Sequence, residues 1–424
     1  MKYILFFLLF STVILCQPGR FERGEQLQQS HELHPTIQIL PSGESEVNLE
    51  YIYRIPHDRL IFERRDNTFL ASVRIQVEVY EDDDLVVREF VDKKITVDDF
   101  NIVKSKFASV QGVINFSLSE NNYTVKGIVT DLNVQKDIKF RTLEISISEL
   151  IETGIYSPIV ISSDKTDCDG NILPHCVNYG GVIPYSSSTY DLIIPIIDTS
   201  ISTIQVEIEK NDDDPIIIDV PDYFTSNIDI VECNEGVFIN EKDSAVVTRN
   251  FIVKEINKDL HEGRIITNVK INDDYTQKFP LLIGWLNKPF SLRNPEFAIE
   301  MLKYIDDESV VLELLDADEE EYPKVLHEYW KQFDPTPETE FNELMEEFYS
   351  RIDYAAMEFR GINKKNGLST DRGRIYVKNG KPDNIERSSD EDGYIVEIWT
   401  YNGTKRKFQF VDKQGTGNFI LIEG

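Results

Sequence analysis

Apolar and polar residues alternate along much of the first 290 residues, which is the pattern of strands with one buried face. The alternation is clearest in residues 69–79, where every odd position is apolar and four of the five even positions are polar. Further strands are predicted at residues 85–90, 109–118, 123–130 and 138–148. About seven short strands in some hundred residues indicate an immunoglobulin-like β-sandwich, which we place at residues 37–152.

A second unit with the same kind of pattern follows at residues 153–289. Its predicted strands lie at residues 190–197, 204–209, 216–220, 245–255, 264–271 and 277–285. We interpret it as another sandwich. Its acidic turns at residues 167–170 and 211–215 are rich in oxygen ligands, but neither has the spacing of a calcium-binding loop, so we expect no metal site there.

The hydrophobic period changes from two to between three and four after residue 290, which indicates helices. Residues 290–335 are predicted to form a helical linker. A longer amphipathic helix is then predicted to start at Thr336, with Pro337 in its first turn, and to end at a left-handed Gly361. The apolar positions of that helix share one face.

The last segment is predicted to be a strand meander packed on this helix. Asn402-Gly403 separates two apolar strands and favours a type I′ hairpin, and a third strand carries Phe419 and Leu421. Residues 336–424 are therefore expected to form an α+β module. The fold class as a whole is mainly β, with two tandem sandwiches, a helical linker and this module.

The module contains four short motifs: Ser369-Thr-Asp-Arg-Gly-Arg-Ile-Tyr376, Gly380-Lys-Pro-Asp383, Glu397-Ile-Trp-Thr-Tyr401 and Phe408-Gln-Phe-Val-Asp412. These motifs resemble those of GWxTD-domain proteins of bacterial envelopes. The resemblance covers about the last 100 residues, the size of one domain, and it implies an envelope location without a settled activity. Leu368 stands where the family has tryptophan.

Charged and aromatic residues of these motifs form the candidate functional cluster, which comprises Thr370, Asp371, Arg372, Arg374, Tyr376 and Trp399. The competing interpretation, which we favour, is structural: Thr370 caps a short helix, Asp371 suits its first turn, and the arginines pair locally. We predict a helix here rather than a strand, because Pro382 would disrupt the partner strand of a hairpin.

The N-terminus has the features of an export signal. A short apolar run at residues 3–15 follows Lys2, so residues 1–16 are predicted to be a signal peptide, and residues 17–36 a flexible lead. Cys16 is a candidate for lipidation, although Leu15 is a poor residue before such a cysteine. We expect an exported protein of the periplasm or outer membrane, with membrane contact only through a lipid at Cys16.

Three further cysteines are compatible with an oxidising compartment. Cys168 and Cys176 flank a short Gly/Pro-containing loop and are the disulfide candidates, which would leave Cys233 unpaired. Pairings with Cys233 stay open, because connectivity does not follow from sequence.

The formal net charge of −31 would repel a phosphate backbone, which argues against nucleic-acid binding. The chain contains no nucleophile elbow, phosphate loop or dinucleotide fingerprint, so we expect no cofactor and favour a non-enzymatic role. The first hypothesis is therefore a scaffold that binds an envelope protein through the C-terminal module. The alternative is a carbohydrate-binding or carbohydrate-acting protein, suggested by the rings of Tyr376, Trp399 and Tyr401.

Overall fold

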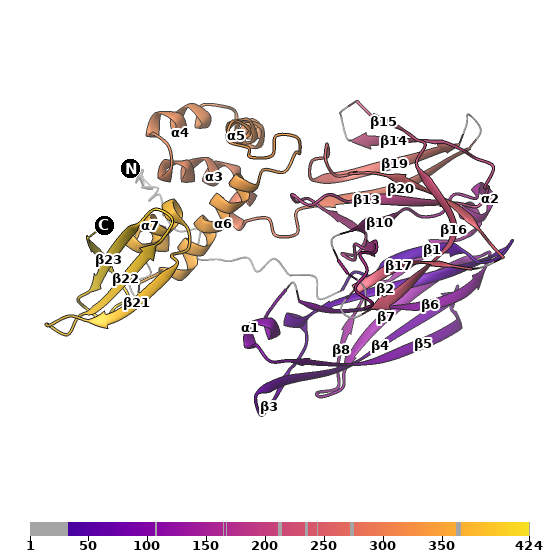
Figure 1. Ribbon diagram of the computed structural model, residues 1–424, viewed down its shortest axis with the longest axis horizontal. Helices are drawn as coiled ribbons and strands as arrows, with labels where there is room; N and C mark the ends of the chain where they lie inside the picture. Colours follow the sequence, from indigo (N-terminus) through magenta and orange to yellow (C-terminus); the bar gives the residue numbers. More distant parts are fainter. Residues whose placement is uncertain are drawn as a thin grey trace, which may run out of the picture.

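The computed structural model describes residues 33–106, 108–163, 165–166, 168–210, 214–233, 236–243, 245–271, 275–361 and 366–423. The predicted signal peptide, Cys16 and residues 17–32 of the predicted lead lie outside this part of the chain. The fold is mainly β, with a C-terminal helical region followed by an antiparallel meander, as predicted. Figure 1 places the meander on the opposite side of the helices from the large β region.

The N-terminal strands form two facing sheets. One sheet has the order β1 (Thr36–Pro41), β2 (Glu46–Pro56) and β6 (Ser109–Ser119). The other is built around β4 (Thr68–Glu81) and β7 (Asn122–Asp131), and its remaining strands are β3 (Glu63–Arg65), β5 (Asp84–Val97), β8 (Lys136–Lys139) and β9 (Leu143–Ser146). The alternating segment at residues 69–79 lies within β4, and its apolar side chains enter the core.

Strand β2 is covered on both faces. Val47, Leu49 and Tyr51 belong to the core shared with β4, whereas Ile52 and Leu40 of β1 pack against strands of the second unit. A strand buried on both faces reads as a nearly continuous apolar run rather than an alternation. The two β units therefore pack directly against each other and share hydrophobic cores.

The second unit contains a closed barrel. Its strands are β10 (Ile159–Ser162), β11 (His175–Cys176), β13 (Asp191–Ile196), β16 (Tyr223–Cys233), β17 (Gly236–Lys242) and β18 (Thr248–Val253). The first residues of β16 pair with β18 and the later ones with β17, so this one strand links two neighbours and helps to close the barrel. The sequence analysis missed β16 and β17 and expected two open sheets.

A five-stranded sheet covers the barrel on the side of β13 and β18. Its strands are β12 (Val182–Pro184), β14 (Ile204–Lys210), β15 (Ile216–Val220), β19 (Gly263–Ile271) and β20 (Tyr275–Gly284). Strand β12 pairs parallel to β20, and the other pairs are antiparallel.

Helices connect the β region to the meander and share one core with it. They are η2 (Phe290–Arg293), α3 (Pro295–Met301), η3 (Leu302–Tyr304), α4 (Glu308–Leu315), η4 (Glu319–Glu321), α5 (Tyr322–Lys331) and α6 (Glu343–Glu358). Short helices α1 (Phe100–Val103), α2 (Ser148–Thr153) and η1 (His57–Arg59) lie in the β region.

The start and end predicted for the long helix were wrong. Helix α6 begins seven residues after Thr336, because the Asn342 side chain accepts a hydrogen bond from the Met345 amide at 2.9 Å and caps it. The Asn342 amide group also donates to the Trp330 carbonyl at 2.8 Å, which ties the cap to α5. At the other end the helix stops at Glu358, and Gly361 does not adopt a positive φ.

The meander has four strands instead of three, because β21 (Asn384–Ser389) was not predicted. It pairs with β22 (Ile395–Tyr401), which is followed by β23 (Arg406–Asp412) and β24 (Ile420–Glu423). The hairpin turn spans residues 402–405 and therefore is not the expected two-residue turn. Lys405, not Gly403, has the positive φ, at 56°.

The structure joins Cys168 to Cys233, with their Cα atoms 5.7 Å apart. The expected Cys168–Cys176 bridge is therefore not formed. Cys176 lies on β11, and its side chain is buried in the core between the barrel and the β1-β2-β6 sheet. The Cys168–Cys233 bridge is one of the pairings that the sequence analysis left open.

The end of the predicted lead is ordered. Leu33 is buried and forms a parallel β-bridge with Phe140, so the chain already packs against the β region three residues before β1. Within the described residues, no helix combines the length and the apolar character needed to cross a bilayer.

Candidate functional site

The motif at residues 367–371 forms the junction between α6, α7 (Asp371–Asn379) and the meander. Gly367 begins the short helix η5 (Gly367–Ser369). A Cβ atom on Gly367 would lie 2.0 Å from the Ala355 carbonyl oxygen of α6, so only glycine permits this approach. Leu368, where the family has tryptophan, is buried in the core that the helices share with the meander.

Thr370 and Asp371 also have structural partners. The Thr370 hydroxyl accepts a hydrogen bond from the Gly373 amide at 3.1 Å and donates one to the Gly367 carbonyl at 2.7 Å. It is the N-cap of α7, as predicted. The Asp371 carboxylate pairs with Arg374 and accepts a hydrogen bond from the Leu421 amide at 2.8 Å, which holds β24 against α7.

Arg372 and Glu397 form the buried centre of the network. Arg372 Nη1 lies 3.5 Å from Glu397 Oε1, and its Nη2 donates to the Gly417 carbonyl at 3.1 Å. The guanidinium also lies over the Phe419 ring at 4.0 Å. Burial lowers the pKa of Arg372, and the charge of Glu397 opposes this effect. Arg372 therefore pairs across the fold rather than locally.

The predicted aromatic residues are mainly core residues. Trp399 is fully buried, and its indole nitrogen donates to Glu397. Tyr401 is buried and donates to the Gly380 carbonyl at 3.0 Å. Tyr376 is half-buried and stacks on Tyr354 at 4.6 Å. The structure thus brings the predicted residues together around α7 and the meander, with Trp399 in the core and Tyr376 half-buried against the exposed Tyr354.

The C-terminal part of the chain is similar to a known family. A model of the GWxTD domain matches residues 270–422. The C-terminal region is a GWxTD domain. The match starts before the predicted helical linker, so it includes α3, α4 and α5 as well as the meander. No curated protein matches the chain.

The GWxTD domain carries an apolar groove between α4 and α5. Its volume is about 510 Å³, and its apolar lining consists of Val310, Leu314, Val325 and Tyr329. Glu313, Lys324, Glu328 and Gln332 complete the lining. Apolar grooves with a polar border commonly mark protein-binding surfaces. Sequence reasoning assigned these helices only a linking role.

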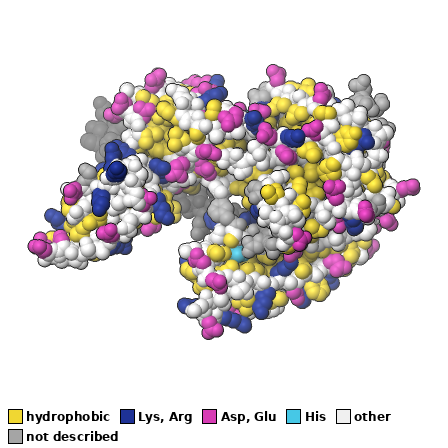
Figure 2. All heavy atoms as spheres, viewed as in Figure 1, with side chains coloured by type: hydrophobic (Ala, Val, Ile, Leu, Met, Phe, Trp, Pro, Cys, Tyr) yellow, Lys and Arg dark blue, Asp and Glu magenta, His cyan; other side chains and the backbone are white. Residues whose placement is uncertain are grey.

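The end of the GWxTD domain also differs in charge from the rest of the protein. Residues 366–424 contain nine basic and nine acidic residues, so the whole net charge of −31 lies in the preceding residues. Exposed Arg387, Lys405, Arg406 and Lys407 lie on the meander. Figure 2 shows dark blue side chains on this lobe, whereas acidic side chains are scattered across the visible face of the molecule.

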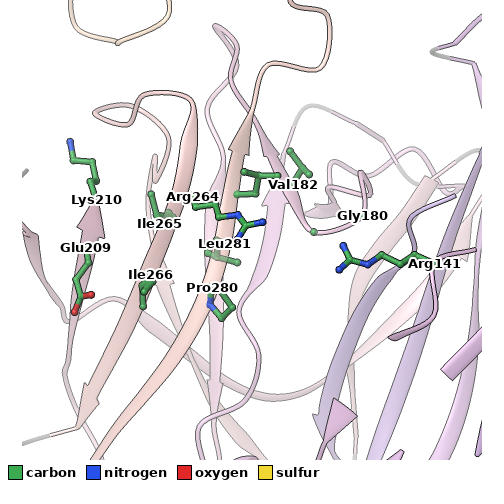
Figure 3. Close-up of a pocket in the computed structure, with 12 residues that line it drawn as sticks. Arg141, Gly180, Val182, Glu209, Lys210, Arg264, Ile265, Ile266, Pro280 and Leu281 are labelled. Atoms are coloured by element: carbon green, nitrogen blue, oxygen red, sulfur yellow. The ribbon is translucent and has the colours of Figure 1, made fainter. Parts of the chain in front are cut away.

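A cleft of about 730 Å³ lies in the β region between β12, β14, β19 and β20 on one side and Arg141, which follows β8, on the other (Figure 3). Arg141 and Arg264 extend into it from opposite sides, and much of its floor is apolar. Its lining residues include neither histidine, cysteine, serine nor threonine. Asp167 and residues 211–213 of the acidic turns lie outside the described part of the chain.

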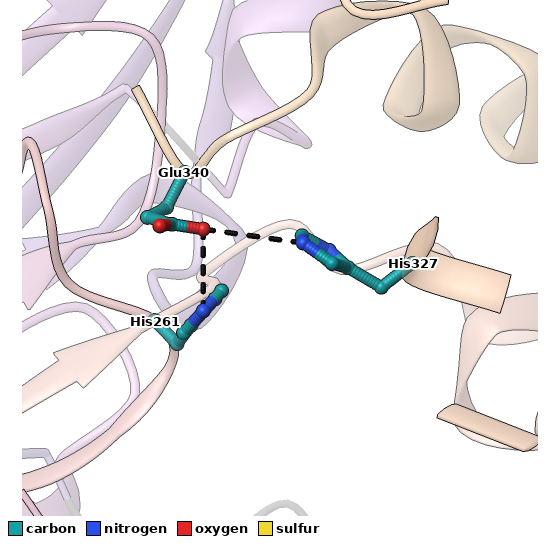
Figure 4. Close-up of side chains that lie close together, drawn as sticks. All are labelled: His261, His327 and Glu340. Atoms are coloured by element: carbon teal, nitrogen blue, oxygen red, sulfur yellow. Dashed lines mark ion pairs between the residues drawn. The ribbon is translucent and has the colours of Figure 1, made fainter. Parts of the chain in front are cut away.

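A second cluster lies where the GWxTD domain meets the β region. His261 comes from the loop before β19, His327 from α5, and Glu340 from the segment before α6 (Figure 4). One carboxylate oxygen of Glu340 lies 3.2 Å from His261 Nε2 and 4.0 Å from His327 Nε2. Sequence analysis missed this cluster, because its members are far apart in the chain and form no spaced motif.

Proposed function

We propose that this protein is a non-enzymatic, exported envelope protein that binds a protein partner through its GWxTD domain. The observation that carries the proposal is that the side chains of the motif form hydrogen bonds within the domain. Thr370, Asp371 and Arg372 are bound to backbone or to other side chains of the domain. They stabilise the domain and leave its surface for contact.

The groove between α4 and α5 is the surface we assign to the partner. Val310, Leu314 and Val325 are partly exposed there, so an apolar side chain or the apolar face of a helix would remove them from water. Leu312 on the same helix is also exposed, which extends the apolar surface beyond the groove. Contact of this kind needs no catalytic group.

Export is supported by two independent features. The apolar run at residues 3–15 has the length of a signal-peptide core. The Cys168–Cys233 disulfide is of a kind that persists mainly in oxidising compartments such as the periplasm. Together they favour a periplasmic or outer-membrane location.

Placing a charge in the apolar groove tests the assignment. A tagged chain is expressed in its native cells, envelopes are cross-linked, and recovered proteins are compared between the wild type and Val325→Glu. We expect a defined partner to be lost with Val325→Glu and retained with Met357→Glu, which adds the same charge to an exposed position of α6 outside the groove. Recovery of nothing beyond background from the wild type, or equal recovery from both variants, would contradict the proposal.

The alternative, carbohydrate binding, rested on the rings of Tyr376, Trp399 and Tyr401. Trp399 and Tyr401 are core side chains, so Tyr376 is the one ring of the three that is partly exposed. The protein-binding proposal is therefore the one we argue.

A further inference from the structure

His261, His327 and Glu340 gather metal-ligand atoms from two regions of the protein. The three side chains each offer one ligand atom, and these atoms all lie within 4.8 Å of one another. Figure 4 shows the two imidazole rings and the carboxylate converging from separate segments. His261 belongs to the β region, whereas His327 lies on a helix of the GWxTD domain.

The spacing is close to what a tetrahedral metal site requires. With bonds of about 2.0–2.1 Å to nitrogen and oxygen, two ligands of a tetrahedral zinc ion lie about 3.3 Å apart. The Glu340 oxygen lies 3.2 Å from one imidazole nitrogen and 4.0 Å from the other. Small rotations of half-exposed side chains would close the remaining difference.

Two of the three ligands are held on the β side. The Glu340 amide donates to the Lys258 carbonyl at 3.0 Å, three residues before His261, and the Glu340 carbonyl accepts from the Tyr185 hydroxyl. The next residue, Phe341, packs against Tyr185 and Trp285 with ring centroids 5.2 and 5.4 Å apart. An ion bound here would therefore connect this fixed pair to α5.

The electrostatic surroundings favour a cation. Three carboxylates, Asp259, Asp334 and Glu338, line a hollow of about 80 Å³ beside His327 and Glu340, and they outnumber the one cation in its lining, Lys331.

We propose that His261, His327 and Glu340 bind a divalent transition-metal ion of the zinc class, which fastens the GWxTD domain to the β region. Two imidazoles select such an ion over calcium or magnesium, which prefer oxygen ligands. The fourth coordination position is left to water or to a further ligand. The proposal is independent of the partner-binding function, because the groove between α4 and α5 is lined by other residues.

The test is a competition titration of the purified, tag-free chain with zinc chloride and a chromophoric chelator. Excess magnesium and calcium chloride occupy the exposed carboxylates of this acidic protein. We expect one zinc ion per chain, and at least about 100-fold weaker binding in His261→Ala and in His327→Ala, since even an outer-shell partner is typically worth 10–100-fold. His34→Ala, which removes an exposed histidine elsewhere, is the matched control and should bind as the wild type does.

Two further measurements separate a specific site from unfolding or diffuse binding. Cobalt chloride should give the visible absorption of tetrahedral Co²⁺ with the wild type and not with the two variants. Zinc should slow hydrogen exchange in α5, while the metal-free variants keep the circular dichroism of the wild type. Absence of stoichiometric zinc binding, or binding that magnesium displaces and that the variants retain, would overturn the proposal.

Discussion

The indole nitrogen of Trp399 donates a 2.6 Å hydrogen bond to the carboxylate of Glu397, two residues earlier on β22. Side chains two apart on a strand point to the same face, so both enter the core of the GWxTD domain. The second Glu397 oxygen accepts from Arg387 Nε at 2.7 Å, and Arg372 lies beside the first. One buried carboxylate thus connects α7 to two strands of the meander.

Replacing Glu397 by glutamine should destabilise the GWxTD domain. The change removes the negative charge that compensates buried Arg372, and breaking a buried ion pair typically costs about 3–5 kcal/mol. Urea unfolding monitored by tryptophan fluorescence measures the loss. Glu386→Gln, on exposed β21, is the control and should stay within about 0.5 kcal/mol of the wild type. A loss below about 1 kcal/mol for Glu397→Gln would show that this network is not needed for stability.

Replacing Gly367 by alanine should also destabilise the domain. The added methyl group would meet the Ala355 carbonyl at 2.0 Å, so α6 and η5 must separate. Overpacking of this kind costs about 1–3 kcal/mol. Thermal unfolding of Gly403→Ala provides the comparison, because no atom lies within 4 Å of a Cβ there. Equal melting temperatures for both variants would contradict the close approach.

Glu50 should make stability depend on pH. It is fully buried on β2, neither of its oxygens has a hydrogen-bond partner among the described residues, and burial, with a smaller effect from Asp229, raises its pKa from 4.5 to about 8. The folded state therefore holds a proton that the unfolded chain releases above pH 4.5. The contribution of this group to stability is fully present below pH 4.5 and is lost as pH rises to about 8.

Glu50→Gln tests this effect, because glutamine keeps the shape of the protonated carboxyl group. We expect the variant to exceed the wild type in stability at pH 8 by on the order of 2–5 kcal/mol, and this advantage to shrink toward pH 4.5. Unfolding free energies measured across this range provide the check. An advantage that is constant with pH would exclude titration of Glu50 as its cause.

Loss of the Cys168–Cys233 bridge should lower stability by about 2–4 kcal/mol, because it closes a long loop in the unfolded chain. Chemical unfolding of Cys168→Ser/Cys233→Ser should match that of the reduced wild type. In the folded wild type Cys176 should resist thiol reagents, because burial raises its pKa to about 12. Rapid labelling of Cys176, or an unchanged stability after reduction, would contradict this pairing.

Local patterns predicted the parts of the fold that depend on neighbouring residues. The alternation at residues 69–79 identified β4, and Thr370 identified the start of α7. In both cases the signal and its structural cause lie within one element. The resemblance of the C-terminal motifs likewise identified the GWxTD domain.

Other features follow from contacts that local patterns do not contain. Strand β16 was missed because it changes partner along its length, so its two ends meet different surroundings. Helix α6 begins at Glu343 because Asn342 caps it and also has a partner on α5, although Thr336 followed by Pro337 fits a helix start locally as well. The disulfide of Cys233 also depends on a distant contact, because its partner Cys168 lies 65 residues earlier in the chain.

By itself, the sequence determined the strand-rich class, the acidic surface and the family of the C-terminal region, because composition and short-range period report directly on burial and secondary structure. Tertiary structure alone decided which charges are neutralised in the core and which ligand atoms converge. Arg372 meets Glu397 across 25 positions, and His261 meets His327 across a domain boundary. Such long-range contacts depend on how the sheets and helices pack against one another, and this packing is determined by the whole chain.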